Sequence, residues 1–534
     1  MLRKFIIALA ACAFIQPAAS AQNSIDNPVT KAVLGVYERQ LKADPNDYNT
    51  WFRRANEYYR HSEYIRALAD INEALRCTPA KETDLRFQEY MLRAGIYNQT
   101  GRYQQALADL NSAVMLDQNS YHALYQRANT EFELGLYTEA KTDYQRLQRL
   151  NSRSLESLLG LARVAVKENN LGLANDYLAE AVALDVNNPE IYVRRASVKK
   201  MMGDHNGAVD DLIVALSIDS KNQKALEALV DYGNTNYVAT VNGLTNAIRQ
   251  APNVGMYRYI RAVIAQAHYN YLSAIDDYQY IIDNRLYNYS GLNASIAECQ
   301  FYLGRFDEAL KEIEYVLATP GATNNASYFI LKSKILRALG RNSEAVEAAA
   351  MATAVAPNSA EALAQMGLAY LSDGKVKEAT NLCNEASLTD ASNPYLYMLR
   401  AWIQNDFIGN SSAAAGLYDQ VLDIDAYDLD NINSLRGFAL LFSDRMPQAE
   451  AWLNNILTNV VDNDGHIHYL AACYYAQAGN ADRALDCAET ALKAGYANLY
   501  DWMNADDARI SVAPIRDELR FLQLINRYTG LFSR

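Results

Sequence analysis

One pattern of apolar residues recurs along most of this 534-residue chain, at an interval of about 34 residues, and it limits the fold more than any other feature. In its first clear copy, Trp51 is followed by Ala55, Tyr58, Ala67 and Ala74. The spacings of three and four residues place such side chains on one face of a helix, and the longer gap allows a turn to a second helix. Alanines let two helices approach closely while aromatic rings fill the gaps above and below them. Each copy therefore predicts one pair of amphipathic helices.

The same spacing of small and aromatic residues, called the residue ladder here, recurs further along the chain. Its clearest copies contain Tyr90, Ala94, Tyr97, Gly101, Ala106, Leu110 and Ala113, then Leu124, Ala128, Gly135, Ala140 and Tyr144, and then Tyr192, Ala196, Gly203, Ala208, Leu212 and Ala215. A glycine stands in the predicted turn of these copies, and prolines follow many second helices because proline cannot continue a helix.

These units resemble tetratricopeptide (TPR) repeats, which are helix–turn–helix motifs of about 34 residues. The resemblance extends from Tyr48 to about Asn498. It implies an all-α, right-handed superhelical solenoid of about thirteen repeats with helical caps at both ends. The units that match best begin near Tyr48, Phe87, Tyr121, Pro189, Gly255 and Ala360.

Departures from the pattern divide the chain into segments. Residues 223–254 keep the length of a repeat but lose the ladder and gain Gly233 and Gly243, which predicts a degenerate repeat and a bend. This segment separates an N-terminal array at 48–222 from a C-terminal array at 255–498. The segment "GNSSAAAG", beginning at Gly409, adds about one residue to a turn between helices.

Helical caps are expected at 22–47 and 499–534, because a solenoid must cover its terminal apolar faces. The first cap should be a lone helix from Asn27 and Pro28 to about Ala43. The last cap should contain a helix that begins at Pro514, and its apolar face should present Leu519, Leu522 and Ile525.

The first 21 residues have the layout of a secretory signal: Arg3 and Lys4, an apolar run, and the small residues Ala19-Ser20-Ala21. Cleavage before Gln22 predicts an exported protein, in the periplasm or at the outer-membrane periphery of a Gram-negative bacterium. The alternative is a lipoprotein signal ending at Cys12, although the residues after Cys12 are apolar rather than a polar tether. No later segment has the ~20 uninterrupted apolar residues of a membrane span.

Charge argues against nucleic acids and anionic membrane surfaces as partners. Cleavage removes two basic residues and no acidic one, so 47 basic and 62 acidic residues remain, a net charge of −15. The mature chain also keeps five cysteines, an odd number without a CxxC motif: Cys77, Cys299, Cys383, Cys473 and Cys487. Most are predicted to be small core residues, and only Cys473 and Cys487 are close enough in sequence for a disulfide within one hairpin.

Five arginines each precede an aspartate by sixteen residues. The pairs are Arg54 and Asp70, Arg93 and Asp109, Arg127 and Asp143, Arg195 and Asp211, and Arg261 and Asp277. In an antiparallel pair of helices this spacing places both side chains at one level, which predicts a repeated, partly buried ion pair. A catalytic site would need these residues to converge on one cleft, and evenly spaced copies do not converge. In the unit near Leu155, Leu161 and Tyr177 replace both partners together.

No pattern in the sequence favours an enzyme, a cofactor or a metal. The sequence has no GxSxG, phosphate loop, HExxH or dinucleotide fingerprint. "DNDGHIH", Asp462 to His468, falls at a predicted turn between repeats, where Asp, Asn and Gly are expected, and its histidines are two residues apart. "DIDAYDLD", Asp423 to Asp430, lacks the glycine and distal glutamate of a calcium loop.

In TPR proteins the inner side of each first helix lines a concave groove for peptides or protein segments, and the resemblance implies the same here. The N-terminal groove would present Phe52, Asn56, Tyr59, Met91, Asn98, Tyr125, Asn129 and Phe132. The C-terminal groove would present Tyr395, Met398, Trp402, Phe438, Phe442 and Tyr469. Asparagines beside aromatic residues suit an extended backbone, whose N–H and C=O groups the amides can bond. The alternative is that several of these rings pack against neighbouring repeats.

The function predicted from these features is a non-enzymatic protein-interaction scaffold of the cell envelope. Chaperone tails are not expected as ligands, because Phe52 stands where the carboxylate-clamp TPR proteins have a basic residue. The alternative is an envelope-anchored protein that binds a small ligand such as a glycan, which would require lipidation of Cys12 and a pocket formed by insertions.

Overall fold

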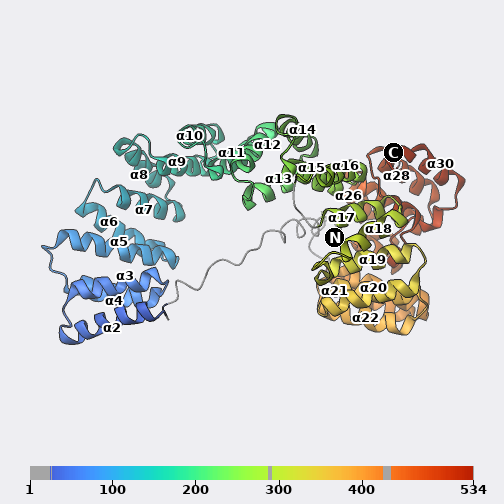
Figure 1. The fold of residues 1–534 in the computed structure, drawn as a ribbon, viewed down its shortest axis with the longest axis horizontal. Coiled ribbons are helices and arrows are strands. Elements are labelled where there is room, and N and C mark those ends of the chain that lie inside the picture. The colour runs from blue at the N-terminus through green and yellow to red at the C-terminus, as the bar shows by residue number, and fades with distance from the viewer. Residues whose placement is uncertain (1–24, 26, 287–290, 425–434, 533–534) are drawn as a thin grey trace. The chain divides into compact units, whose positions relative to one another are not determined.

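The computed structural model describes residues 25, 27–286, 291–424 and 435–532. The predicted signal at 1–21, Cys12 and most of the stretch from Asp423 to Asp430 lie outside these residues. The described residues form helices and turns and contain no β-strand. From α3 to α28 the helices follow one another as thirteen consecutive pairs (Figure 1). The prediction of an all-α chain of about thirteen helix–turn–helix repeats is therefore confirmed.

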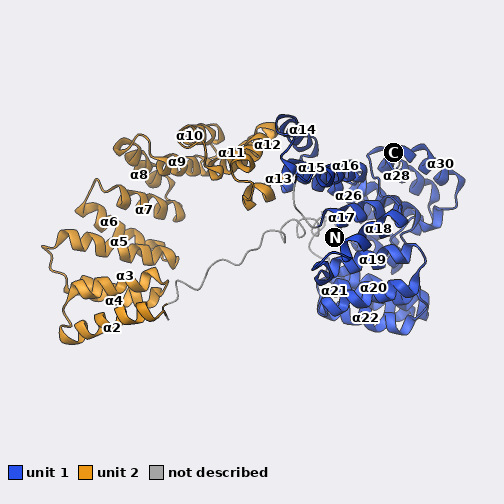
Figure 2. Cartoon of the chain, viewed as in Figure 1, with its two compact units in different colours: residues 1–13, 230–534 blue, residues 14–229 orange. Residues whose placement is uncertain are grey.

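The chain divides into two compact units, and the boundary falls between residues 229 and 230 (Figure 2). Unit 2 is the N-terminal part and unit 1 the C-terminal part. The boundary lies inside α13 (Gln223–Thr235), within the segment that lacks the residue ladder.

Unit 2 contains one lone helix and five helix pairs. The lone helix α2 spans Pro28–Ala43, as expected for the first cap. The pairs are α3 (Tyr48–Arg60) with α4 (Tyr64–Cys77), α5 (Thr83–Gln99) with α6 (Tyr103–Leu116), α7 (Tyr121–Glu133) with α8 (Tyr137–Leu150), α9 (Leu155–Lys167) with α10 (Leu171–Leu184), and α11 (Pro189–Met202) with α12 (His205–Ile218).

After α13, the next helix in the chain is α14 (Tyr237–Gln250), and these two helices are the sixth of the thirteen pairs. Unit 1 continues the same construction after α14. Its pairs are α15 (Gly255–Ala267) with α16 (Tyr271–Asp283), α17 (Leu292–Tyr302) with α18 (Phe306–Leu317), α19 (Ala326–Ala338) with α20 (Asn342–Val355), α21 (Ala360–Ser372) with α22 (Val376–Thr389), α23 (Pro394–Trp402) with α24 (Ser411–Ile424), α25 (Arg436–Phe442) with α26 (Met446–Asn459), and α27 (His466–Gln477) with α28 (Ala481–Lys493).

Small residues against large rings hold neighbouring helices together. Ala55, Ala67 and Ala74 are completely buried where α3 meets α4, because an alanine lets two backbones approach closely. Between repeats, the buried ring of Tyr144 on α8 lies against Gly160 on α9, so closely that a β-carbon at Gly160 would collide with it. The residue ladder thus specifies both the helices and their packing.

The extra residue predicted near Gly409 is accommodated in a helix rather than in a turn. The first helix of that repeat continues from α23 into a π-helical segment, Ile403–Ile408, and ends at Gly409, whose φ is 76°. A π-helix holds one more residue per turn than an α-helix, so the repeat keeps its partner helix α24 in place.

The last cap differs from its prediction. Pro514 lies in a short 3₁₀ turn, Ala513–Ile515, and the terminal helix α30 begins only at Leu519 and ends at Arg527. Its buried face consists of Phe521 and Leu524, whereas Leu519 is 71% exposed. The helix starts late because the residues before it are held in an irregular path across unit 1.

This irregular path, residues 496–516, is called the C-terminal segment here. It contains α29 (Leu499–Met503), the 3₁₀ turns Asp507–Arg509 and Ala513–Ile515, and two consecutive non-glycine residues with positive φ, Ala508 and Arg509. It lies against the C-terminal ends of several first helices of unit 1, from α17 to α27. The segment is therefore more than a cover for the last repeat, because its contacts reach repeats far back in the sequence.

Candidate functional site

The five arginine–aspartate pairs have one common geometry. In each pair the Nε and Nη2 groups of the arginine donate to the two carboxylate oxygens at 2.6–2.9 Å. The aspartate side chains are only 4–7% exposed. Two parallel hydrogen bonds to one carboxylate are the strongest arrangement available to arginine. Each pair connects the first and second helices of its own repeat.

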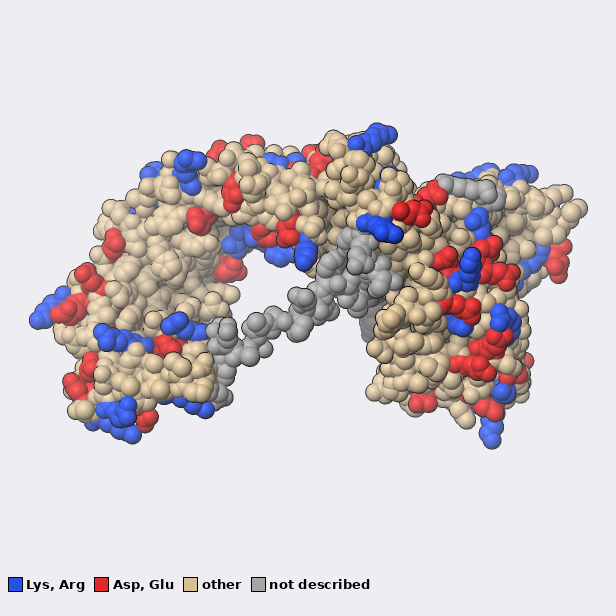
Figure 3. Space-filling model, viewed as in Figure 1, with Lys and Arg blue, Asp and Glu red and all other residues tan. Residues whose placement is uncertain are grey.

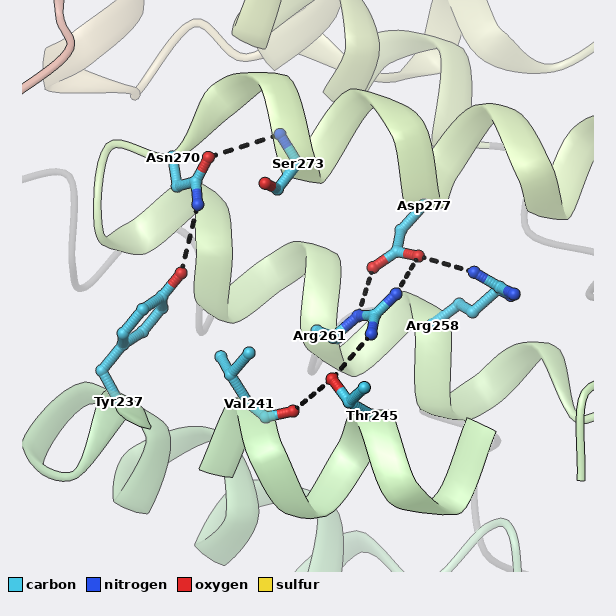
Figure 4. Close-up of polar contacts among 8 residues, drawn as sticks. All are labelled: Tyr237, Val241, Thr245, Arg258, Arg261, Asn270, Ser273 and Asp277. Atoms are coloured by element: carbon cyan, nitrogen blue, oxygen red, sulfur yellow. Dashed lines mark hydrogen bonds and ion pairs between the residues drawn. The ribbon is translucent and has the colours of Figure 1, made fainter. Parts of the chain in front are cut away.

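Three of these arginines also contact the preceding repeat. The Nη1 group donates from Arg93 to Asn72, from Arg127 to Asn111 and from Arg261 to Thr245, at 2.8–3.1 Å. Figure 4 shows the contact between Arg261 and Thr245. The hydrogen bonds that Arg127 donates to Asp143 raise the pKa of Arg127, which keeps this guanidinium charged. One guanidinium thus joins three helices.

The residues predicted to line the N-terminal groove divide into two groups. Phe52, Tyr59 and Tyr125 are half-buried and Asn56 is exposed, whereas Met91 and Phe132 are buried. The side chains of Met91 and Phe132 pack within the array, and for the Phe132 ring this agrees with the alternative that the sequence left open.

The two remaining asparagines bond to neighbouring helices. The amide of Asn98 donates to the hydroxyl of Thr130 at 2.9 Å, from α5 to α7. The amide oxygen of Asn129 accepts a hydrogen bond from the Tyr144 hydroxyl at 2.7 Å. These bonds give both side chains a structural role that the sequence analysis did not assign.

A cavity of about 300 Å³ lies further along the same face of unit 2, mainly between α7, α9 and α11. It is lined by Phe132, Leu159, Ala162, Arg163, Val166, Lys167, Leu178, Arg194, Ser197, Val198 and Met201. Only Phe132 belongs to the predicted groove. Three of the other residues could have been found by adding one repeat length of 34 to Tyr125, Asn129 and Phe132, which gives Leu159, Arg163 and Val166.

Basic side chains border this apolar cavity. The guanidinium of Arg163 lies over the Phe132 ring at 4.0 Å and donates to Glu133 at 2.8 Å. Lys167 and Met201 are exposed, and Met201 keeps 52% of its surface in solvent. Figure 3 shows basic and acidic side chains side by side along the edge of unit 2 beneath α9 to α11. The cavity can accept an apolar side chain, and its border can bond polar groups on either side of it.

The predicted C-terminal groove requires a correction. Met398, Phe438 and Tyr469 are each less than 5% exposed, so they cannot contact a partner. The ring of Tyr469 stacks on Tyr496 at 4.7 Å and meets the edge of Trp502 at 4.9 Å. Both of these rings belong to the C-terminal segment.

The other three residues of that predicted groove are half-buried beside the protein's own chain. Trp402 lies against Phe407 at 5.1 Å, and the Arg509 guanidinium lies over Phe442 at 5.8 Å. The charges of Asp507 and Arg337 act on Tyr395, although burial is the main reason that its pKa is raised. The C-terminal segment therefore contacts the face that a partner would have used.

Charged residues fix the C-terminal segment in place. Asp507 accepts two hydrogen bonds from Arg337 at 2.8 and 3.3 Å, and Arg509 donates to Asp406 of the π-helical segment at 2.7 Å. Burial raises the pKa of Asp501 to about 6, although the Tyr496 hydroxyl, which donates to it, opposes this rise.

The remaining candidates of the sequence analysis contact other side chains or are free thiols. Asp462 accepts a hydrogen bond from the ring of His468, and Asp464 faces His268 at 3.6 Å. Within the described residues no three His, Cys, Asp or Glu side chains are grouped as metal ligands would be. Cys473 and Cys487 carry free thiols, so the structure contains no bridge between them. No described helix has both the length and the apolar character needed to cross a membrane.

Comparison with known proteins identifies the repeats. Residues 90–120 and residues 125–189 each match a model of the tetratricopeptide repeat. A comparison with curated proteins finds no match.

Three similar solved structures have TM-scores of 0.30–0.36. Yeast Tom70 is 13% identical over 76% of this chain and 96% of its own. A tetratricopeptide repeat protein from Parabacteroides merdae is 15% identical over 54% of this chain and 98% of its own. YrrB, described as a TPR protein with an unusual peptide-binding site, is 18% identical over 36% of this chain and 98% of its own. Two stretches of the chain therefore match the tetratricopeptide repeat, and the thirteen helix pairs share one helix–turn–helix construction.

Proposed function

We propose that this protein is a non-enzymatic scaffold that binds an extended peptide or protein segment on unit 2. The observation that carries the proposal is the cavity between α7, α9 and α11, which is apolar inside and basic at its border. Such a site can hold one apolar side chain of a segment while charged groups bond the polar parts on either side.

The contrast between the two units supports this choice of surface. In unit 1 the corresponding face is in contact with the C-terminal segment, and Met398 and Phe438 are almost completely buried. In unit 2, Ser197 and Met201 remain exposed beside the cavity. A partner can therefore reach these two side chains of unit 2.

The location in the cell envelope is part of the proposal. It rests on the signal-like pattern of residues 1–21, and cleavage before Gln22 would place the mature chain in the periplasm or at the outer-membrane periphery. Intact-mass measurement of the protein from its source cells tests this, since a lipid on Cys12 would support anchoring instead.

A photocrosslinking experiment tests the binding surface. A photoreactive phenylalanine analogue at Ser197, which is exposed beside the cavity, should crosslink to one defined segment of a partner in the cell envelope. The same analogue at Val186, which is 56% exposed and does not line the cavity, is the matched control. Adding Met201→Asp should reduce crosslinking from Ser197 by about tenfold or more, because it places a charge beside the apolar cavity. Equal crosslinking from both positions would contradict the proposed surface.

A second candidate function is the binding of a small ligand such as a glycan. It is favoured by a separate cavity of about 430 Å³ in unit 1, which forms between helices without any long insertion.

A further inference from the structure

The repeat of α15 and α16 differs from the other four repeats that carry the ion pair in the residue three positions before the paired arginine. In the other four repeats that carry the ion pair, the residue three positions before the paired arginine is apolar or aromatic: Trp51, Tyr90, Leu124 and Tyr192. In three of them the paired guanidinium lies over that ring, at 4.9–6.0 Å. In the repeat of α15 and α16 this position is Arg258. A charged residue thus replaces the ring that elsewhere covers the pair.

A cavity of about 430 Å³ lies beside Arg258, between α14, α15 and α16. The Arg258 guanidinium, which lines the cavity, lies over the Tyr280 ring with its central carbon 3.7 Å from the ring centroid. Figure 4 shows that the polar residues around this region come from all three helices, with Tyr237 on α14 facing Asn270 beside α16. The size is sufficient for a sugar-sized molecule.

The charges at this site are unequal. Asp277 accepts two hydrogen bonds from Arg261, at 2.7 and 2.8 Å, and a third from Arg258 at 3.0 Å. Two guanidinium groups therefore share one buried carboxylate, so the buried part of the site has two positive groups and one negative group. Asp276 also lines the cavity, but it is exposed, so water screens its charge.

One hydrogen-bond donor is left unused. The Nε group of Arg258 is shielded from solvent and has no acceptor among the residues that the structure describes. A buried donor without an acceptor costs free energy, and an anionic oxygen would satisfy both this donor and the excess charge. Arg258 is thus suited to bind an acidic group.

The rest of the cavity is suited to hydroxyl groups. Asn270 donates to the Tyr237 hydroxyl at 3.3 Å, which leaves the hydrogen of that hydroxyl available as a donor. The Ser273 hydroxyl and the Asp276 carboxylate add a second donor and an acceptor.

We propose that this cavity binds a small molecule that carries one carboxylate together with several hydroxyl groups, the chemistry of a uronic acid. The carboxylate bonds Arg258, and the hydroxyl groups bond Tyr237, Ser273 and Asp276. A neutral sugar lacks the acidic group, and a bare anion leaves the hydroxyl-binding residues unused.

Ligand-observed NMR and isothermal titration of the full chain with D-glucuronate test the proposal. Glucuronate should bind saturably, and D-glucose should bind at least about tenfold more weakly because it lacks the carboxylate. Arg258→Leu should lower the affinity for glucuronate by about tenfold or more. Leucine already stands at the equivalent position 124, so this variant should keep its fold, as circular dichroism and the melting temperature will show. Arg249→Leu is the matched control, since Arg249 is exposed on α14 and does not line the cavity.

Three results would overturn the proposal. The first is the absence of saturable glucuronate binding by the wild-type chain, and the second is unchanged binding by a folded Arg258→Leu variant. The third is inorganic phosphate binding as tightly as glucuronate, which would show an adventitious ion only. None of these results bears on the surface of unit 2, whose test depends on Ser197 and Met201.

Discussion

Replacing Arg127 with leucine should destabilise its repeat because the change leaves a buried carboxylate without its partner. Arg127 donates to Asp143 at 2.6 and 2.9 Å and to Asn111 at 3.1 Å. The Asp143 side chain is 6% exposed, and that of Arg127 is 18% exposed. The substitution therefore removes three hydrogen bonds from a pair in which the arginine is partly exposed to water and the aspartate is buried.

The structure sets the size of the effect. Removing one partner of a fully buried ion pair costs about 3–5 kcal/mol, and the partial exposure of Arg127 lowers this to about 2–3 kcal/mol. Asp143→Leu leaves the more exposed partner behind and should cost about 1–2 kcal/mol. The double substitution removes both charges together, so it should cost about 2 kcal/mol rather than the sum of the two, which is a coupling of about 2 kcal/mol.

Hydrogen–deuterium exchange with mass spectrometry can measure these losses for α7 and α8 separately from the rest of the chain. This resolution is necessary because a protein of two units does not unfold in one step. Arg149→Leu on the exposed side of α8 is the matched control, with an expected change below about 0.5 kcal/mol. If the two single losses simply add in the double variant, the charges are not coupled and the structural role of the pair is refuted.

Three further predictions concern buried groups. Burial raises the pKa of Glu131 to about 7 from 4.5, so the free energy of unfolding should fall as pH rises between these values, because the unfolded chain then loses a proton that the folded chain keeps. Glu131→Gln should remove this pH dependence, which urea titrations at pH 5 and pH 8 can measure. Trp502→Ala should destabilise unit 1 by about 3–5 kcal/mol, and amide exchange should increase in α27 but not in unit 2. Arg337→Met should cost about 1–3 kcal/mol, since Asp507 is 26% exposed, and it should increase exchange in residues 499–512.

Local pattern was sufficient to predict the fold. The spacing of alanines and aromatic residues specifies a helix pair within each repeat, and the pair needs only its neighbours to bury its apolar face. The sixteen-residue spacing of Arg54 and Asp70 likewise depends on one hairpin alone, and the two side chains are in contact.

Features that depend on distant residues were not predictable in this way. Nothing near Tyr469 in the sequence indicates that Trp502 covers it. Likewise, nothing near Arg337 indicates that its partner is Asp507, 170 residues later. The late start of α30 has the same origin, because the preceding segment follows contacts with remote helices rather than its own helix propensity. The cavity in unit 2 is a different case, because several of its residues lie one repeat length of 34 after predicted groove residues. The predicted N-terminal groove ended at Phe132 and was not extended to the next repeat.

The C-terminal segment also affects the order in which the chain can fold. In most solenoids each repeat contacts only its neighbours, so repeats can fold one after another as they are synthesised. Unit 2 fits this description, but in unit 1 Arg305 bonds the backbone oxygen of Phe532, 227 residues away. Contacts over such distances slow folding, because a long loop must close before they form. Unit 1 therefore cannot complete these contacts until Phe532 has been synthesised, and rings such as Phe301 and Tyr469 remain open to aggregation or to chaperones until the C-terminal segment covers them.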